Sequence, residues 1–146
     1  MKWNNRSEVW MHFIMSVCGG FLGGYAVFGR MAVFGSAQTA NLIELVGDIL
    51  GRNTTDALLR FGALVLYIAA MVIFSVMSKK TAWNLKYLVL LVDTAAVAVL
   101  STMPEKMDPL LALYAVFFAM SFQWCVFKGA EGDVCSTIFS SNNLKQ

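Results

Sequence analysis

Three polar side chains, Gln38, Thr39 and Asn41, crowd into one helical turn of residues 18–45, a stretch that is otherwise apolar and rich in glycine. Amide and hydroxyl groups both donate and accept hydrogen bonds, so this cluster suits a polar solute that is uncharged or zwitterionic. A weaker cluster of the same chemistry lies near the end of the sequence. We therefore predict a substrate-binding site formed by Gln38, Thr39, Asn41, Gln123, Ser141 and Asn143.

A single carboxylate, Asp93, stands inside the apolar run 87–103. A carboxylate at such a depth in a bilayer costs about 2.5–3.5 kcal/mol on insertion scales, so it should face a partner or water rather than lipid. We predict that Asp93 faces the protein interior and is a candidate for ion coupling, as a proton or cation site.

The remaining reactive residues do not form a catalytic or metal-binding pattern. The one histidine, His12, stands at the edge of the first apolar run, where an interfacial residue is expected rather than a proton relay. The sequence has no HExxH, GxSxG or phosphate-binding glycine motif. Cys18, Cys125 and Cys135 have no CxxC spacing and are expected to be small buried hydrophobic residues. We predict no enzyme activity, no metal and no cofactor.

Composition indicates the elements that must hold the polar residues. Hydrophobic residues make up 58% of the 146 residues and charged residues only 14%, against about 45–50% and about 25% in soluble proteins. The apolar residues also form long runs, which is typical of membrane spans. We predict an all-α, polytopic helical membrane protein with about five to six membrane segments. The formal charge of +2 is too small to indicate nucleic-acid binding.

Four spans are expected near residues 9–29, 57–78, 87–103 and 109–127, and a fifth membrane segment at 31–50. The fifth segment carries Glu44 and Asp48 besides the polar cluster, and it either crosses the membrane or re-enters it as a broken helix. Lys79, Lys80 and Lys86 place their loop in the cytoplasm by the positive-inside rule. The N-terminus is external if 31–50 crosses and internal if it re-enters.

Other charges and the glycines have expected structural roles. Glu44 and Asp48 should lie at a solvated helix end, and Arg60 should extend to the lipid headgroups. Gly19, Gly20, Gly23 and Gly24 form two overlapping small-xxx-small pairs, a pattern typical of close helix packing.

A short internal repeat relates the two ends of the sequence. Ala26-Val27-Phe28 aligns with Cys125-Val126-Phe127, and Thr39-Ala40-Asn41-Leu42 then aligns with Ser141-Asn142-Asn143-Leu144. Polar interruptions at matching places of two halves point to a transporter's binding site. We predict one domain, 1–146, with a first repeat at 9–78, a connecting span at 85–103 and a second repeat at 109–146.

At these residues the chain resembles the YoaK-like family of bacterial integral membrane proteins, a family of unknown function. Gly20-Phe21-Leu22-Gly23 stands where that family has glycine-phenylalanine-x-aspartate, and Gln38-Thr39-Ala40-Asn41 stands at its threonine-glycine-asparagine motif. Gln123 matches a glutamine of the second half. The family aspartate is Gly23 here, and the motif glycine is Ala40, with Asn142 at its second-half counterpart. Family members typically run longer, so the chain is expected to be truncated at its C-terminus.

Two functions fit these features. The first is a small-molecule permease or channel-like transporter of the bacterial cytoplasmic membrane, whose partners are the lipid bilayer, a small polar solute and, as a homo-oligomer, copies of itself. The second is a non-transporting accessory subunit or scaffold, whose glycine, asparagine and threonine residues only pack helices.

Overall fold

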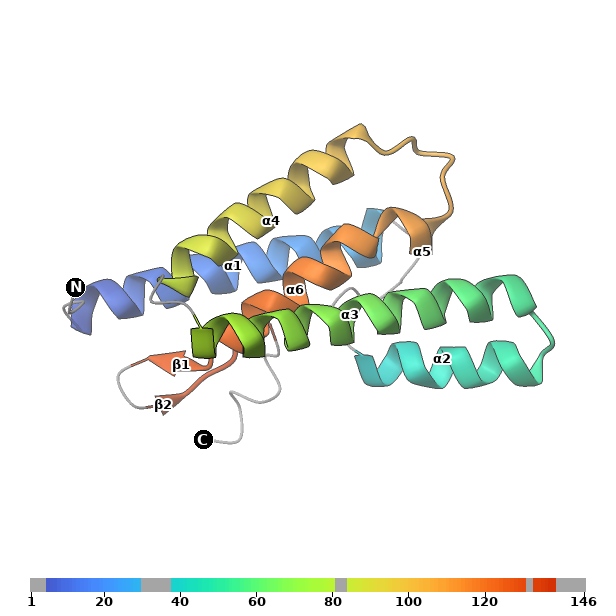
Figure 1. The fold of residues 1–146 in the computed structure, drawn as a ribbon. Helices are drawn as coiled ribbons and strands as arrows, with labels where there is room; N and C mark the ends of the chain where they lie inside the picture. Colours follow the sequence, from blue (N-terminus) through green and yellow to red (C-terminus); the bar gives the residue numbers. More distant parts are fainter. Residues whose placement is uncertain (1–4, 30–37, 81–83, 131–132, 139–146) are drawn as a thin grey trace.

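The computed structural model describes residues 5–29, 38–80, 84–130 and 133–138. Within them the chain is helical apart from one short hairpin (Figure 1). The helices are α1 (Asn5–Gly29), α2 (Gln38–Leu50), α3 (Thr54–Lys80), α4 (Leu85–Thr102), α5 (Pro109–Ala112) and α6 (Tyr114–Val126). The two strands, β1 (Gly129–Ala130) and β2 (Asp133–Val134), pair antiparallel, with Gly129 opposite Val134.

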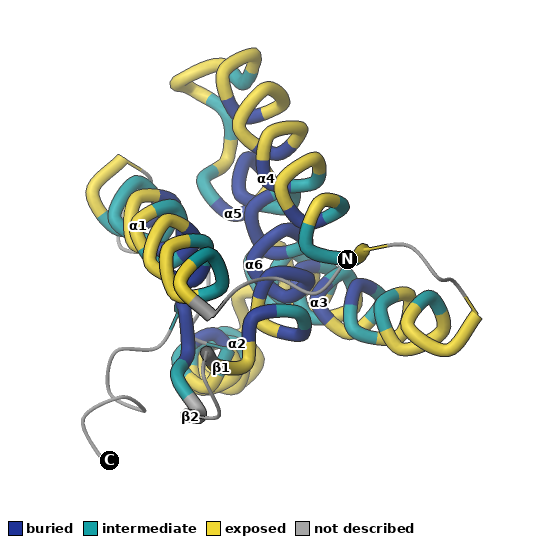
Figure 2. The backbone as a smooth tube through the Cα atoms, turned by 90° about the vertical axis from the view of Figure 1, so that its left-hand side faces the viewer, coloured by how far each residue is buried: buried dark blue, intermediate teal, exposed yellow. Residues whose placement is uncertain are grey.

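The short helix α6 lies at the centre of the bundle and is buried on most of its surface (Figure 2). Helices α3 and α4 pack on different sides of it, and α1 contributes Leu22 and Ala26 to the core that surrounds it. A second core cluster joins Met15 of α1 to Phe122 and Phe127 near the other end of α6. Helix α6 is apolar all round, as expected of a helix enclosed by others.

The outer helices have the polarity of a membrane protein. Each presents large apolar side chains outward, among them Phe21 (66% exposed), Ile43 (68%) and Leu91 (65%). In water such a continuous apolar surface would drive association, whereas lipid solvates it. Among the described residues, three helices, α1, α3 and α4, are long and apolar enough to cross a membrane, and α6 is a shorter apolar helix. The prediction of an all-α polytopic membrane fold is therefore confirmed.

The segment predicted as one span, 109–127, is instead two helices. Asp108 caps α5 by accepting hydrogen bonds from the N–H groups of Leu110 and Leu111, with Pro109 in the first turn. Leu113 then adopts φ −89° and ψ 0°, and its N–H is shared between the carbonyls of Pro109 and Leu110. This local distortion ends α5 after one turn, and α6 begins at the next residue, Tyr114.

Helix α2 is the described part of the segment predicted at 31–50; residues 31–37 lie outside the described residues. Its 13 residues are about 20 Å long, which is short of the hydrocarbon core of about 30 Å. It lies antiparallel beside the first half of α3 (Figure 1). Asn41, Glu44 and Asp48 lie on the face toward α3, while Ile43 and Val46 are exposed, so the polar face is turned inward.

The ion pairs of Arg60 correct two expectations. Arg60 binds Glu44, and its Nε donates to Asp48 Oδ2 at 2.7 Å. Its side chain is only 14% exposed, so it does not extend to the headgroups, and Asp48 is not simply at a solvated helix end. The expectations for Arg60 and Asp48 were wrong because α2 packs on α3 with these two charges between the helices, where pairing stabilises them better than lipid contact. The side chain of Glu44 is 40% exposed, so its expected exposed position is not contradicted.

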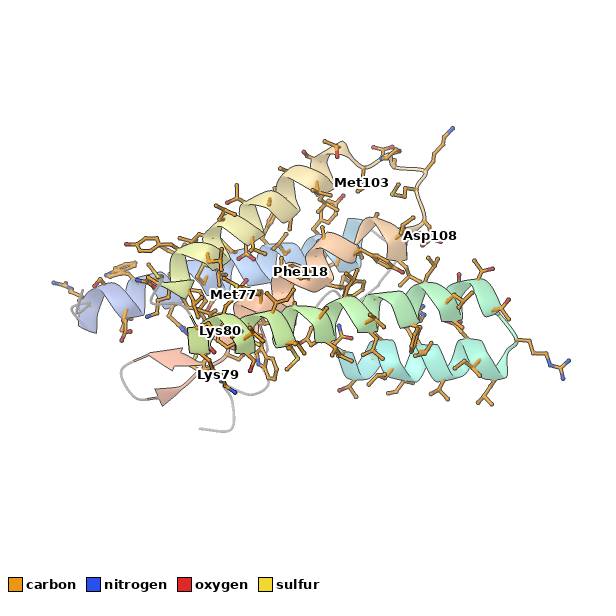
Figure 3. The ribbon with its side chains drawn as sticks, in the orientation of Figure 1. Met77, Lys79, Lys80, Met103, Asp108 and Phe118 are labelled. Carbon is orange, nitrogen blue, oxygen red and sulfur yellow. The ribbon has the colours of Figure 1, made fainter. Side chains whose placement is uncertain are left out.

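The two ends of the bundle can be told apart. Lys86 Nζ lies 2.7 Å from Glu8 Oε1, which places the start of α1 beside the start of α4. Lys79 and Lys80 lie at this end, whereas Met103 and Asp108 lie at the other (Figure 3). The end of α1 and the α2–α3 turn both lie away from the Lys86 end (Figure 1). Between these two points the chain therefore makes no net crossing from one end of the bundle to the other. This arrangement favours the re-entrant alternative.

Labelling of single cysteines checks this topology. In a cysteine-free background, we expect Arg6→Cys and Lys80→Cys to react with an impermeant maleimide from the same side of the membrane. Arg52→Cys, in the α2–α3 turn, should react from the other side. Reaction of Arg6→Cys and Lys80→Cys from opposite sides would contradict the arrangement, and it would mean that residues 30–50 cross the membrane.

Candidate functional site

A buried junction forms around Gln123, in the middle of the bundle. Its side chain is fully buried, and Nε2 donates to the carbonyl of Met15 at 2.8 Å and to Thr137 Oγ1 at 3.0 Å. Three parts of the chain meet there: α1, α6 and the segment that follows the hairpin. Gln123 thus ties these elements together, while its Oε1 accepts no hydrogen bond from the described residues.

Gly19 makes this junction possible. A Cβ at this position would lie 2.7 Å from the carbonyl oxygen of Thr137 and 3.1 Å from Nε2 of Gln123. A Cβ at Gly20, Gly23 or Gly24 would meet no atom within 4 Å among the described residues. The expected packing role of the four glycines is therefore seen at Gly19, whereas the other three face open space in the described structure.

Asp93 lies on the inward face of α4 and opens onto a groove between α4 and α1. It is 7% exposed, and neither carboxylate oxygen accepts a hydrogen bond from any residue that the structure describes. The groove has a volume of about 500 Å³ and is lined from α1 by Cys18 and Phe21 and from α4 by Asp93 and Thr94, among others. The carboxylate lies about 12 Å along α4 from Leu85, near the middle of a membrane-spanning helix. Asp93 therefore faces inward, as expected, and its ion-coupling role stays a prediction.

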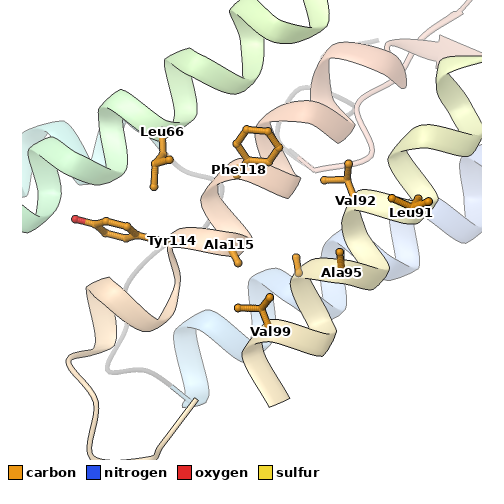
Figure 4. Close-up of a pocket in the computed structure, with 9 residues that line it drawn as sticks. Leu66, Leu91, Val92, Ala95, Val99, Tyr114, Ala115 and Phe118 are labelled. Atoms are coloured by element: carbon orange, nitrogen blue, oxygen red, sulfur yellow. The ribbon is translucent and has the colours of Figure 1, made fainter. Parts of the chain in front are cut away.

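A second groove, of about 360 Å³, differs in character (Figure 4). It lies between α3, α4 and α6, and its walls are aliphatic and aromatic. The hydroxyl of Tyr114 is its one polar side-chain group, and that hydroxyl donates to the carbonyl of Leu59 at 2.7 Å. This groove offers a polar solute nothing to bind, so the groove at Asp93 is the better candidate site.

The predicted polar cluster lies elsewhere. Asn41 is buried and Gln38 is half-buried on α2, whereas Thr39 is exposed. Helix α2 packs against α3, while Gln123 and Asp93 face α1. The predicted partners Ser141 and Asn143 lie outside the described residues, so their convergence with α2 stays a prediction.

The burial of His12 was not predicted from the sequence. The side chain is 7% exposed, its ring packs edge-on against Phe127 with 6.4 Å between the centroids, and neither ring nitrogen has a hydrogen-bond partner among the described residues. A signal was available: Glu8, His12, Met15 and Gly19 recur at intervals of three and four residues, which places them on one helix face. His12 is a buried residue on the inward face of α1, and its expected depth at the membrane interface stays a prediction.

These elements define the class of the protein: an all-α polytopic membrane protein with buried polar groups between its helices. Among the described residues, no group of three or more histidine, cysteine, aspartate or glutamate side chains could hold a metal ion. The chain belongs to a family described as proteins of unknown function, DUF1275, whose model matches residues 11–146. That family includes YoaK-like membrane proteins, so the expected relationship is confirmed. Comparisons with curated proteins and with solved structures find no match.

Proposed function

We propose that the protein is an ion-coupled permease for a small polar solute, and not an enzyme. The observation that carries this proposal is Asp93, a carboxylate with no hydrogen-bond partner among the described residues, on the inward face of α4 and opening onto a groove. Burying a polar group without a hydrogen bond is costly. A carboxylate that stays in such a place is by default a functional group, and a proton or a small cation is the simplest partner that would neutralise it.

In this proposal the amide and hydroxyl groups of α2 bind the solute. The shortness of α2, which has 13 residues, and its inward polar face support it, because re-entrant helices bring polar side chains and free backbone groups to the middle of the membrane. The second half of the internal repeat, with Ser141 and Asn143, would complete the site. The bacterial cytoplasmic membrane is the proposed location, with the Lys86 end of the bundle inside.

Uptake into proteoliposomes tests the proposal. The protein is reconstituted and screened with radiolabelled amino acids, nucleobases and small amides, under an imposed pH gradient and without it. We expect uptake of one solute class that rises with the gradient. Absence of uptake for every class, with an intact fold, would favour the alternative of an accessory subunit or scaffold.

The substitution Asp93→Asn should separate transport from stability. We expect loss of the pH or cation dependence of uptake, because the amide takes up no proton. Thermal stability in detergent should stay equal or rise, because the substitution removes a buried carboxylate that has no hydrogen-bond partner in the described part of the chain. Thr94→Val is the matched control: Thr94 lines the same groove, and its hydroxyl donates to the carbonyl of Leu90 on its own helix at 2.7 Å. Uptake by Asp93→Asn that matches the wild type at every pH would remove the coupling role.

A further inference from the structure

We infer that the groove between α1 and α4 binds an organic monocation with an apolar body, in exchange for a proton on Asp93. This inference rests on the proposed function in one respect, because it takes Asp93 as the site of the coupling ion and names what else occupies that site. It starts from a contrast within the groove. One buried carboxylate, which accepts no hydrogen bond from the described residues, stands among walls that are otherwise mostly apolar.

The walls of the groove favour an apolar body. They include Phe21 and Leu22 from α1 and Leu90 and Val97 from α4. The volume of about 500 Å³ lies within the range of about 300–1,000 Å³ that is usual for small-molecule sites. Such sites are mostly apolar and carry a few polar groups that orient the ligand. A ligand that fills this groove therefore has an apolar body and one group that meets Asp93.

The polar groups of the groove do not suit a small inorganic cation. Asp93 is the one carboxylate among the described residues that line it, and Thr94 and Cys18 carry the other polar side chains. Ions such as Mg²⁺ and Ca²⁺ take about six to eight oxygen ligands, and the described part of the chain has no cluster of acidic, histidine or cysteine side chains fit for a metal ion. A compact ammonium group is strongly hydrated and is also poorly matched to apolar walls. Besides a proton, the cation that suits Asp93 is one whose own apolar groups cover its charge.

Phe21 adds a second attraction for such a cation. Its ring lines the same groove as the carboxylate of Asp93. The face of an aromatic ring attracts a quaternary ammonium ion, and this attraction grows when the cation is desolvated. A carboxylate and an aromatic ring in one apolar groove thus match both the charge and the body of the cation.

The rim of the groove is apolar and exposed in the described structure. Val17 and Phe21 form it on α1, and Leu90 and Val97 form it on α4. Both helices are long and apolar enough to cross a membrane, so this rim faces the part of the bilayer where lipid chains lie. A cation with an apolar body partitions into a bilayer far better than a bare ion does. We therefore expect it to enter the groove from the lipid.

The exchange involves one proton. When the cation binds, the carboxylic acid of Asp93 gives its proton to the solution, and the carboxylate then pairs with the cation. When a proton returns, Asp93 becomes neutral and the cation leaves. Cys18 lines the same groove and is close enough to act electrostatically on Asp93. Other titratable side chains of α1, α4 and α6 have contacts elsewhere, among them His12 with Phe127, Lys86 with Glu8, Tyr114 with Leu59 and Cys125 with Tyr67.

Equilibrium dialysis tests this binding without any transported solute. The full chain is placed in lipid nanodiscs with radiolabelled tetraphenylphosphonium, a monocation covered by aromatic rings, and binding to empty nanodiscs is subtracted. We expect saturable binding that weakens as the pH falls. Once Asp93 is mostly protonated, Kd should rise about tenfold per pH unit, because one proton competes with one cation. In a weakly buffered sample, the probe should also release protons, which a pH-sensitive dye records.

Three variants separate the parts of the site. Asp93→Asn should weaken binding about tenfold or more and remove its pH dependence, because it removes the charge that pairs with the cation. Phe21→Leu should weaken binding about two- to fivefold and keep the pH dependence, because only the attraction of the ring is lost. Asp108→Asn is the matched control: it makes the same chemical change at the N-cap of α5, where an amide oxygen also caps a helix. Its binding should equal that of the wild type.

Two kinds of result would overturn the inference. Equal binding by Asp93→Asn and the wild type, or wild-type binding that does not change with pH, would mean that the probe only partitions into apolar surface. Displacement of the probe by sodium chloride, but not by N-methylglucamine chloride at the same concentration, would assign the groove to a small inorganic cation. The wild-type pH series decides the matter even if Asp93→Asn does not fold. Each of these failures leaves the permease proposal standing, because that proposal fails only in the uptake assay.

Discussion

Gly19→Ala should destabilise the protein strongly although it adds one methyl group. The new Cβ would lie 2.7 Å from the carbonyl oxygen of Thr137, which is a backbone atom and cannot turn away. Overpacking of this kind costs about 1–3 kcal/mol. Displacement of Gln123 adds to this cost, because its fully buried amide would lose its hydrogen bonds to Met15 and Thr137. A buried polar group left without a hydrogen bond costs about 1–3 kcal/mol.

Gly20→Ala is the matched control for this prediction. It makes the same chemical change one residue further along α1, where a Cβ meets no described atom within 4 Å. Alanine is favoured over glycine inside a helix by about 1 kcal/mol, so this variant should be as stable as the wild type or more stable. Both variants are compared by unfolding in mixed micelles. Equal stability of the two would contradict the junction around Gln123.

Arg60→Gln should release α2 from α3. The substitution leaves Asp48 without its cation between α2 and α3, and it also removes the cation that Glu44 pairs with at the exposed edge of this contact. Removing one partner of a fully buried ion pair costs about 3–5 kcal/mol, and we expect the lower end of this range because the side chains of Arg60 and Asp48 are 14% and 20% exposed. Hydrogen exchange should rise at the amides of α2 before it rises elsewhere, because the ion pairs that are lost join α2 to α3.

The double variant Arg60→Gln with Asp48→Asn is the control for the orphaned charge. It removes the better buried of the two carboxylates, so part of the lost stability should return, as a double-mutant cycle would measure. If Arg60 instead reached the headgroups, Arg60→Gln would cost less than about 1 kcal/mol, as exposed ion pairs do. Such a small effect, with unchanged exchange in α2, would contradict the observed pairing.

The sequence alone was sufficient for the membrane class, the long helices and the inward orientation of Asp93. These features depend on local patterns: an apolar run of sufficient length forms a helix in lipid, and a lone carboxylate in it turns away from lipid. The start of α5 was also readable, because Pro109 in a first turn is a local signal. The break at Leu113 could not be predicted from the sequence, since nothing in its apolar neighbours interrupts a helical pattern.

Only the tertiary structure decided which polar groups meet. Glu8 pairs with Lys86 across 78 residues, and Gln123 reaches the carbonyl of Met15 across 108 residues. Each helix has several faces, and a sequence pattern does not say which face another helix covers. For this reason four equivalent-looking glycines differ, with only Gly19 at a close contact in the described structure. For the same reason the position of His12 along α1 did not reveal that its side chain is buried, with its ring packed against Phe127.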